Sequence, residues 1–352
     1  MPSFDRADLA LAALESLERQ TYRDFRAVLV DDGSSDGTVE RVRRRFPDAR
    51  VVALRRNRGF AGAVNAGLRT SPAELIALLN NDAEPEPSWL AELVAALDRH
   101  PDVAGVASLI LRREPRGAID SAGDGVSALF LPYPIGSNEP DDGRYGRERP
   151  VFAASGGAVL YRRELFDEIG LFDERFFAYF EDVDLSFRAQ LAGKRFLFEP
   201  RSRVLHAGAA TSGGRFSPLA VRLSTRNLLF VLAKNLPAPL LWRGLPRIAA
   251  GQAYWFLKMA VKERRLGAWL TGVIAGLGRF VAMRRSGRAS RAIAQLSADE
   301  LAERLALSAD EVSLSVRRKR SGGANGNGRS HAMDASASRV TSTNDSCGVG
   351  DA

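Results

Sequence analysis

Hydrophobic residues in the front half of the chain follow two alternating spacings. They recur at helical spacing in residues 7–19 and 84–100, which predicts amphipathic helices there. Short, almost continuous apolar segments are typical of buried strands, and they occupy residues 25–30, 50–54, 75–79 and 103–111. Strands and helices that alternate in this way predict a three-layer α/β fold with a mainly parallel central sheet.

Polar turns directly follow two of the predicted strands. Asp31 and Asp32 begin a Gly/Ser-rich turn, and the third strand runs into the Asn-Asn-Asp sequence of residues 80–82. Open α/β sheets bind ligands at the carboxyl ends of their strands, so both turns are candidate binding sites. Two simpler roles stay open: Ser35 or Asp36 as a helix cap, and residues 80–82 as an ordinary turn. A cap alone does not require two acids in tandem.

Three carboxylates crowd the segment from residue 176 to residue 206. Glu181, Asp182 and Asp184 fall within four residues, behind an aromatic-rich approach, and the histidine His206 ends the segment. Like charges this close repel and raise one another's pKa, so the cluster is typical of a base, a metal ligand or both. The alternative is a helix N-terminus, where the helix dipole favours acidic residues.

Glycine-rich stretches in the middle of the chain narrow the class of ligand. Gly59, Gly62 and Gly67 do not match the GxGxxG spacing of a dinucleotide fingerprint, which disfavours a nicotinamide enzyme. Residues 113–149 are rich in Gly, Pro and Asp and predict a long loop with short strands, as in lids and binding segments. The small residues 153–158 predict a strand that a ligand or another backbone can approach closely.

The back third of the chain has a helical pattern. Residues 219–236 predict a helix that ends before Pro237, and two apolar segments follow at 245–261 and 266–283. Each segment is shorter or more interrupted than the ~20 apolar residues of a spanning helix. Flanking Arg and Lys residues indicate interfacial helices, and a soluble helical hairpin is the alternative. From Lys319 onward the Gly/Ser/Asn/Ala-rich sequence predicts a disordered tail.

Charge is unevenly distributed over the 352 residues. The net charge is +8, but residues 201–320 contain 22 Lys and Arg against 6 Asp and Glu, so the rest of the chain is acidic. A basic back half indicates an anionic partner. Nucleic acid is not expected, because zinc-finger spacings and RNA-binding aromatic motifs are missing, and an anionic membrane surface fits better. The N-terminal residues carry charges where a signal peptide would be apolar, and the only cysteine is Cys347, which together indicate a reducing cytoplasm.

Five ordered motifs resemble those of a known enzyme family. The chain contains, in the order found in family 2 glycosyltransferases, VDDGSSDGT, NRGFAGAVNAGL, LLNNDAEP, ASGGAVLYRRELFDEIGLFDERFFAYFEDVDLSFRAQLAGKRFLFEP and the segment around His206. The resemblance covers about residues 2–240 and is closest to the rhamnosyltransferase-like and galactofuranosyltransferase-like branch. It implies the GT-A fold, a nucleotide-diphosphate-sugar donor, a divalent metal and an inverting mechanism.

The resemblance assigns nucleotide-binding residues by position. Asp32, with Asp31, matches the acid that contacts the nucleotide base. Asn57, Gly59 and Asn65 match the segment that lines the nucleotide pocket. All five are therefore expected to bind the donor.

A metal site is implied by the same resemblance. Asn80 and Asp82 stand where the family has its DxD motif, so both are expected at the donor diphosphate, with Asp82 on the metal. His206 resembles the histidine that completes the site. Asn80 replaces the first acid of the motif and is a neutral, weaker oxygen ligand. A hard cation that accepts oxygen ligands and water, Mg or Mn, fits this set.

The catalytic residues come from the acidic cluster. Asp182 matches the family's catalytic base, with Glu181 and Asp184 shaping the site around it. An inverting transfer needs a carboxylate to take the proton of the acceptor hydroxyl as its oxygen attacks the anomeric carbon. Positive charge stabilises the departing nucleoside diphosphate. Base and metal lie on opposite sides of the sugar, so they are expected from distant parts of the sequence.

The expected organisation has three parts. They are a catalytic domain over residues 1–218, a basic helical, membrane-associating region over 219–318 and a disordered tail over 319–352. The N-terminus differs from that of the family, because residues 1–6 resemble only the tip of the family's first strand. A parallel sheet without that strand loses interior hydrogen bonds, so the natural start is expected a few residues upstream.

These observations predict a metal-dependent hexosyltransferase, cytoplasmic and peripheral on the inner face of the cell membrane. It would move rhamnose from a nucleotide-diphosphate donor to a glycan or lipid-linked acceptor in cell-envelope polysaccharide synthesis. Galactofuranose or another hexose is the alternative donor. A non-catalytic nucleotide-sugar-binding partner is the alternative from another class of protein.

Overall fold

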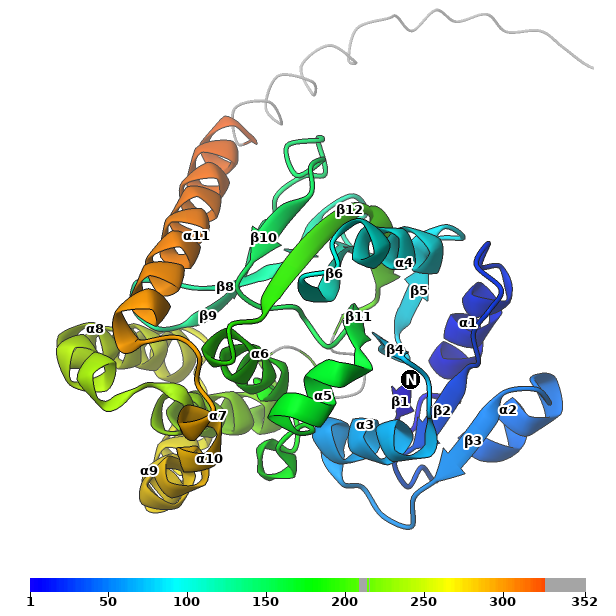
Figure 1. The fold of residues 1–352 in the computed structure, drawn as a ribbon, viewed down its shortest axis with the longest axis horizontal. Coiled ribbons are helices and arrows are strands. Elements are labelled where there is room, and N and C mark those ends of the chain that lie inside the picture. Colours follow the sequence, from blue (N-terminus) through cyan, green and yellow to red (C-terminus); the bar gives the residue numbers. More distant parts are fainter. Residues whose placement is uncertain (209–213, 215, 327–352) are drawn as a thin grey trace, which may run out of the picture.

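A β-sheet forms the centre of the molecule, with helices on both sides (Figure 1). This computed structural model describes residues 1–208, 214 and 216–326, with side chains through Lys319. The strands are β1 (Pro2–Ser3), β2 (Val28–Asp31), β3 (Arg50–Ala53), β4 (Leu75–Leu79), β5 (Ala83–Pro85), β6 (Val103–Arg112), β7 (Ile119–Ala122), β8 (Asp124–Val126), β9 (Pro132–Pro134), β10 (Arg149–Val151), β11 (Ala158–Arg162) and β12 (Arg195–His206). A small sheet has the order β1-β2-β3. A larger one has the order β10-β12-β6-β11-β4, with β5 paired to β12 and β7 to β6.

Strand directions are mixed, which corrects the expectation of a mainly parallel sheet. The pairs β1–β2, β2–β3 and β6–β12 are parallel, but β11 is antiparallel to both of its neighbours, β4 and β6. The long segment after β6 returns the chain to the edge where β4 ends, and Ala158 there pairs with Leu79. Because β11 starts at that edge, it has to run the opposite way. Hydrophobic spacing carries no information on strand direction.

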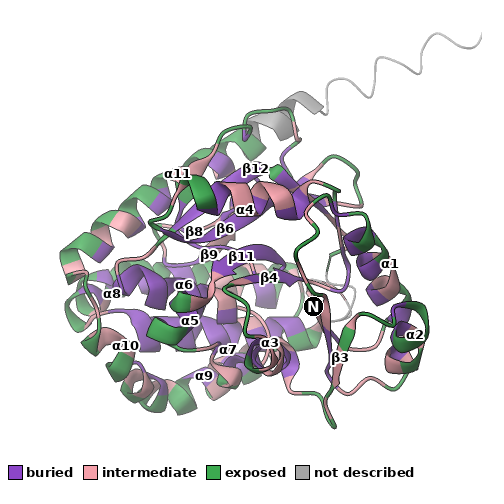
Figure 2. Ribbon diagram, turned by 45° about the vertical axis from the view of Figure 1, so that its right-hand side comes forward, coloured by how far each residue is buried: buried purple, intermediate pink, exposed green. Residues whose placement is uncertain are grey.

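Two hydrophobic cores on opposite faces of the sheet make the fold three-layered, as expected. The helices α1 (Ala7–Glu18), α2 (Thr38–Arg45) and α4 (Trp89–Arg99) pack on one face, and α3 (Gly59–Thr70), α5 (Arg163–Ile169) and α6 (Glu181–Leu191) pack on the other. Successive residues of β11 alternate between the cores, with Leu160 in the first and Val159 and Tyr161 in the second. Figure 2 shows the buried residues gathered on the sheet and on the inner faces of these helices.

The start of α4 differs from the sequence prediction. The apolar pattern predicts a helix over residues 84–100, but the helix begins at Trp89, and residues 83–85 form β5 instead. Pro85 and Pro87 explain the difference, because proline disfavours helical conformation in the residue before it and cannot donate a helical hydrogen bond. The result matters for the site, since β5 pairs with the end of β12.

Helices also form the back third of the described chain. They are α7 (Pro218–Asn235), α8 (Ala238–Phe256) with a π-helical turn over Leu257–Lys262, α9 (Leu266–Ser286), α10 (Arg288–Ala292) and α11 (Ala298–Gly326). A third core joins α6 to α7, α8, α9 and α11. Residues 319–326, expected in a disordered tail, are helical, because an existing helix gains a hydrogen bond with each added residue. Residues 327–352, with Cys347, lie outside the described residues.

Candidate active site

Three sequence-distant turns meet at one edge of the sheet. Asn80 follows β4, Asp182 lies in the first turn of α6, and Gly156–Gly157 precede β11. The amide of Asn80 donates to the carbonyl oxygen of Gly157 at 2.9 Å, and the amide of Gly156 donates to Oδ2 of Asp182 at 2.9 Å. The candidate metal turn and the candidate base therefore lie on either side of this glycine pair. The expected small-residue strand over 153–158 is replaced here by a turn, with the strand starting at Ala158.

Asp182 has the surroundings of a general base. It is half-buried, and its oxygens accept hydrogen bonds from the amides of Gly156 and Val183, at 2.9 and 2.8 Å. Burial raises the pKa of Asp182, and these hydrogen bonds oppose the rise only in part. A carboxylate with a raised pKa is a stronger base.

Glu181 is more deeply buried than its neighbour Asp182. It is 5% exposed, and within the described part of the chain its Oε2 atom has no hydrogen-bond partner. Burial, with repulsion from Asp182 as a second cause, raises the pKa of Glu181 well above its usual value. The surroundings of Glu181 therefore disfavour its charged form.

The turn before α6 is strained and is held by α7. Phe177, Tyr179 and Phe180 have positive φ angles of 68°, 71° and 66°, a region that costs energy for residues other than glycine. The side-chain amide of Asn227 donates to three carbonyl oxygens of residues 176–179, at 3.0, 2.9 and 2.6 Å. One buried side chain therefore fixes the turn that positions Asp182. No sequence pattern marks Asn227 as a site residue, because it lies far along the chain within an ordinary helix pattern.

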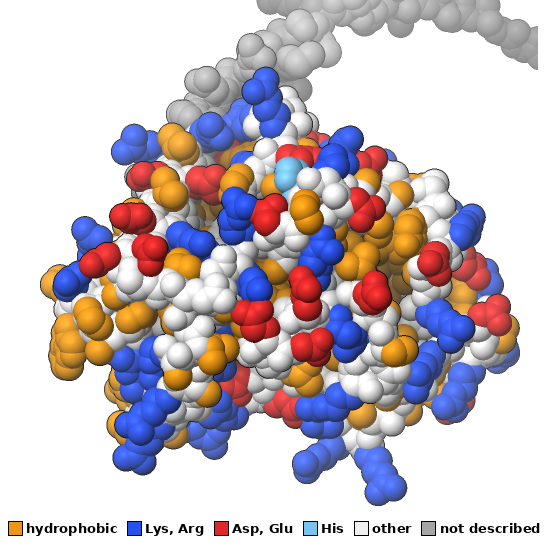
Figure 3. Space-filling view, in the orientation of Figure 1, with side chains coloured by type: hydrophobic (Ala, Val, Ile, Leu, Met, Phe, Trp, Pro, Cys, Tyr) orange, Lys and Arg blue, Asp and Glu red, His pale blue; other side chains and the backbone are white. Residues whose placement is uncertain are grey.

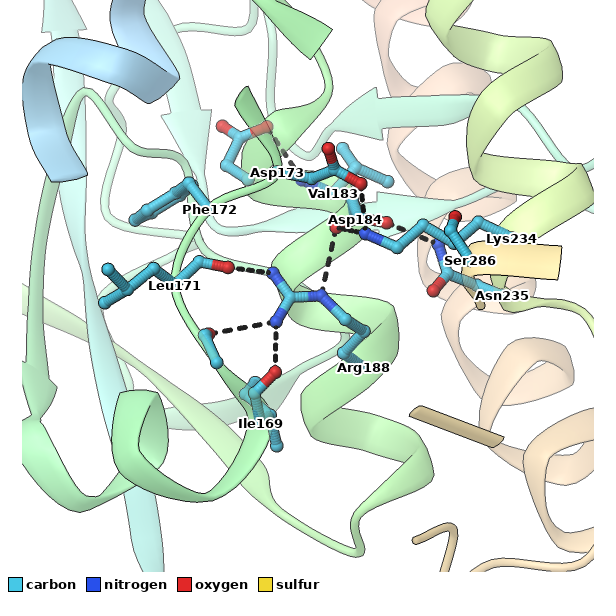
Figure 4. Close-up of polar contacts among 12 residues, drawn as sticks. Ile169, Leu171, Phe172, Asp173, Val183, Asp184, Arg188, Lys234, Asn235 and Ser286 are labelled. Carbon is cyan, nitrogen blue, oxygen red and sulfur yellow. Dashed lines mark hydrogen bonds and ion pairs between the residues drawn. The ribbon is translucent and has the colours of Figure 1, made fainter. Parts of the chain in front are cut away.

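Asp184 does not face the site, which corrects its expected role there. It is completely buried and binds Lys234 Nζ at 2.8 Å, Arg188 Nε at 3.0 Å and Asn235 Nδ2 at 2.9 Å (Figure 4). Lys234 also binds Asp173 at 2.7 Å. Burial alone would raise the pKa of Asp184, but Lys234 and Arg188 outweigh it and lower the pKa. Asp184 is an anchor between α6 and α7.

Residues expected at the nucleotide lie along the ends of β2 and β3. Asp32 is buried, and its Oδ1 accepts a hydrogen bond from the amide of Arg58 at 2.7 Å. Burial outweighs this bond and raises the pKa of Asp32 to about 6. Asp31 accepts from the amide of Ser34 at 3.1 Å, while its Oδ1 has no hydrogen-bond partner within the described ranges. Asn57 is exposed at the same edge. Asp31, Asp32 and Asn57 are compatible with a nucleotide pocket.

Gly59 and Asn65, also expected at the nucleotide, contact the segment of residues 172–177. Gly59 has φ +74°, and a side chain there would collide with the carbonyl oxygen of Phe177. Asn65 is 1% exposed and exchanges two hydrogen bonds with the backbone of Phe172, at 2.8 and 3.1 Å. Both residues therefore position the segment before Asp182. Their contact with the nucleotide stays a prediction.

The candidate metal ligands come together through strand register. His206, the last residue of β12, pairs with Ala83 of β5, which places it beside Asp82. His206 Nε2 lies 3.1 Å from Asp82 Oδ1 without hydrogen-bond geometry. Its Nδ1 lies 3.0 Å from Oδ2 of Asp120, a carboxylate that the sequence did not single out. Burial lowers the pKa of His206, but the two carboxylates outweigh it and raise the pKa to about 9.

This pair fits a divalent cation. Cis ligands of one octahedral ion lie ~3 Å apart, close to the separation of His206 Nε2 and Asp82 Oδ1. A carboxylate on the other ring nitrogen, as Asp120 provides, is the usual support of a metal-binding histidine. Within the described residues, no group of three or more His, Cys, Asp or Glu is arranged for a metal. Asp82 and His206 are therefore the two side chains that could hold a cation, with half-buried Asn80 two residues before Asp82.

This chain is similar in sequence to known proteins. Residues 1–170 match the family model described as Glycosyl transferase family 2. The chain is 31% identical over 223 residues to N-acetylglucosaminyl-diphospho-decaprenol L-rhamnosyltransferase of Mycobacterium tuberculosis, covering 57% of this chain and 72% of that protein. It is 31% identical over 221 residues to O-antigen biosynthesis protein RfbC of Myxococcus xanthus, covering 60% of this chain and 17% of the relative.

A solved structure shows the same fold. The crystal structure of GalNAc-T7 with UDP, GalNAc and Mn2+ aligns with a TM-score of 0.53 at 19% identity, covering 78% of this chain and 51% of that one. This likeness concerns the fold alone, whereas the relationship to the mycobacterial rhamnosyltransferase extends over most of that enzyme. The chain belongs to glycosyltransferase family 2 and has the family's GT-A-like α/β fold, followed by a helical region.

Proposed function

We propose that this glycosyltransferase moves rhamnose, with inversion, from a nucleotide-diphosphate donor to a lipid-linked glycan in cell-envelope polysaccharide synthesis. The observation that carries the proposal is the position of Asp182. Gly156 and Gly157 hold this half-buried carboxylate beside the turn of residues 80–82, and Asp82 of that turn contacts His206. A base and a diphosphate site on either side of a side-chain-free turn suit a sugar bound between them.

In the proposed reaction, different residues of the chain have separate roles. Asp182 accepts the proton of the acceptor hydroxyl as the oxygen of that hydroxyl forms a bond to the anomeric carbon. Glu181, beside Asp182, is buried with a raised pKa, and Asn227 holds the turn that orients Asp182. Asp82 and His206 would hold a Mg or Mn ion, whose charge stabilises the departing nucleoside diphosphate.

The proposed donor and acceptor are inferred from similar proteins. The mycobacterial relative is named for transfer of L-rhamnose to N-acetylglucosaminyl-diphospho-decaprenol, a polyprenol-linked sugar. The solved structure of similar fold contains UDP, GalNAc and Mn2+. These findings favour rhamnose as donor sugar, a polyprenol-linked acceptor and a divalent cation, with galactofuranose or another hexose as the competing donors.

A donor panel tests the proposed reaction. Purified protein with Mn or Mg is given nucleotide-activated rhamnose, galactofuranose and hexoses, together with a polyprenol-diphosphate-linked N-acetylglucosamine, and product formation is measured by mass spectrometry. We expect transfer from the rhamnose donor, lost on addition of a chelator. Transfer only from another donor would overturn the proposal that rhamnose is the donor sugar. Donor binding without transfer from any donor would favour the non-catalytic alternative.

Metal affinity should follow the charge of the residues at positions 80 and 82. We expect Asp82→Asn to weaken Mn2+ binding by about 10-fold or more, because an amide oxygen replaces the carboxylate ligand. Asn80→Asp should strengthen binding by adding the missing acid. Electron paramagnetic resonance of free Mn2+, titrated in the presence of UDP, measures both without any turnover. Equal affinities in all three proteins would exclude this turn as the metal site.

A further inference from the structure

An exposed hydrophobic surface covers the α8–α9 hairpin. We name it the hairpin face and define it by ten large hydrophobic residues. Their exposed fractions run from 43% to 69%, and they are Trp242, Leu245, Tyr254, Leu257, Val261, Leu266, Leu270, Ile274, Leu277 and Val281. Figure 3 shows hydrophobic side chains gathered at the edge of the molecule where Figure 1 places α8, with Lys and Arg close by. Exposed apolar surface of this extent usually marks an interaction site.

The orientation of α9 is fixed by its opposite side. Gly272 and Gly276 pack against the backbone and side chains of α7, and an added Cβ atom would lie 2.6 Å from Arg222 O or Leu229 Cδ1. This close contact leaves the residues at positions 266, 270, 274, 277 and 281 pointing outward, one helical stripe along the whole of α9. The stripe is thus not free to rotate inward.

The hairpin tip is rigid and combines apolar with cationic side chains. Phe256 of α8 and Trp269 of α9 stack edge to face with their ring centres 4.8 Å apart, and the amide of Arg265 donates to Met259 O at 2.9 Å. Exposed Lys262 and Arg264 lie at the same tip. Residues 218–286 contain twelve Lys and Arg residues and a single acidic residue, Glu263.

This combination favours a lipid surface over a second copy of the chain. Two copies meeting through the hairpin face would bring two strongly cationic surfaces together, which repel. An anionic bilayer supplies hydrocarbon for the leucines and negative headgroups for the arginines and lysines. Half-exposed Trp242 and Tyr254 suit the polar–apolar boundary of a membrane.

The packing of α9 disfavours a hairpin that crosses a membrane. By length and composition α9 could span a bilayer, with a mean hydropathy of 1.5, which corrects the expectation that residues 266–283 are too short or interrupted for this. However, α9 packs against α7, whose Arg226 and Lys234 are bound to the segment before Asp182 and to Asp184. A crossing hairpin would carry charged residues of α7, with the Lys234–Asp184 ion pair, towards hydrocarbon, which is costly.

We infer that the hairpin face inserts into the headgroup boundary of an anionic membrane and docks the enzyme there through α8 and α9. Because α7 connects this surface to the turn that holds Asp182, docking brings the base to the side from which a lipid-linked acceptor would arrive. The inference is independent of the donor sugar.

Vesicle flotation of the full chain tests it without any nucleotide sugar. Wild type should float with phosphatidylcholine vesicles that contain phosphatidylglycerol, and less with pure phosphatidylcholine. We expect Leu270→Glu combined with Ile274→Glu to weaken partitioning by more than ~10-fold, since two inserted side chains become charged. The matched control, Leu307→Glu with Leu314→Glu, changes two equally exposed leucines of α11 and should float like wild type.

Other outcomes separate the competing explanations. Wild type that stays in the soluble fraction, or a control that loses as much binding as the hairpin variant, would overturn the inference. So would light scattering that shows a dimer in wild type and a monomer in the hairpin variant, because a second copy would then cover the face. Circular dichroism checks folding, and hairpin-variant activity on a water-soluble acceptor analogue is expected to match wild type.

Discussion

Asp182→Asn is expected to slow sugar transfer about 1,000-fold while the protein stays folded and binds UDP. The amide has nearly the same shape, and its oxygen can still accept a hydrogen bond from the backbone, so the first turn of α6 should stay in place. What disappears is the group that takes the acceptor proton. Transfer rates, with UDP affinity measured by calorimetry, separate loss of chemistry from loss of binding.

Glu181→Gln is the matched control for this variant. Burial raises the pKa of Glu181 well above its usual value and so favours its neutral form, whose shape and charge an amide reproduces. We therefore expect less than ~10-fold loss from Glu181→Gln. If Glu181→Gln were as damaging as Asp182→Asn, the assignment of the base to Asp182 would fail.

The raised pKa of Asp182 also predicts a pH profile. Only the deprotonated carboxylate accepts a proton, so activity should fall as the pH drops through the pKa of Asp182. Because burial raises this pKa, the fall should begin at a higher pH than for an exposed aspartate. The acidic limb of the rate profile measures it.

Lys234→Met is expected to destabilise the protein by about 3 kcal/mol. Lys234 is 5% exposed and binds two carboxylates, Asp173 and Asp184, which lose a counter-charge in this variant. Arg188 and Asn235 still contact Asp184, so the cost should not reach that of a fully unpaired buried charge. Denaturant unfolding measures the difference in free energy.

A surface ion pair supplies the control for Lys234. Arg243 and Asp299 form a pair whose side chains are 69% and 78% exposed, so Arg243→Met should cost less than ~1 kcal/mol. Equal costs for the two variants would show that the buried network does not hold α6 to α7.

The stabilisation by Lys234 should also depend on pH in a definite direction. Lys234 and Arg188 lower the folded-state pKa of Asp184, and Arg175 and Lys234 lower that of Asp173, in each case against the effect of burial. Groups with a depressed folded-state pKa stabilise the fold above the unfolded carboxyl pKa of ~4 and lose that effect on acidification. The gap between wild type and Lys234→Met should therefore narrow as the pH falls below ~4.

Local residue spacing predicted the three layers and most helices and strands, because these depend on short-range periodicity. The resemblance to family 2 glycosyltransferases assigned Asp82, His206 and Asp182 to one site. Strand β11 shows where such reasoning stops, because its direction follows from the return path of a long loop to the end of β4.

In the acidic cluster too, local sequence predicted part of the arrangement and tertiary packing decided the rest. Asp182 and Asp184 are two residues apart, which on a helix turns their side chains about 200° from each other. One therefore faces the glycine turn and the other faces α7, although the sequence places both in one motif. Asn227 and Lys234 on α7, and Asp120 beside His206, reach the site from elements distant in the chain. Residue type and spacing were enough to identify candidate site residues. Which carboxylate faces the site, which one anchors α6 to α7 and which one supports His206 depended on long-range packing, which no local pattern encodes.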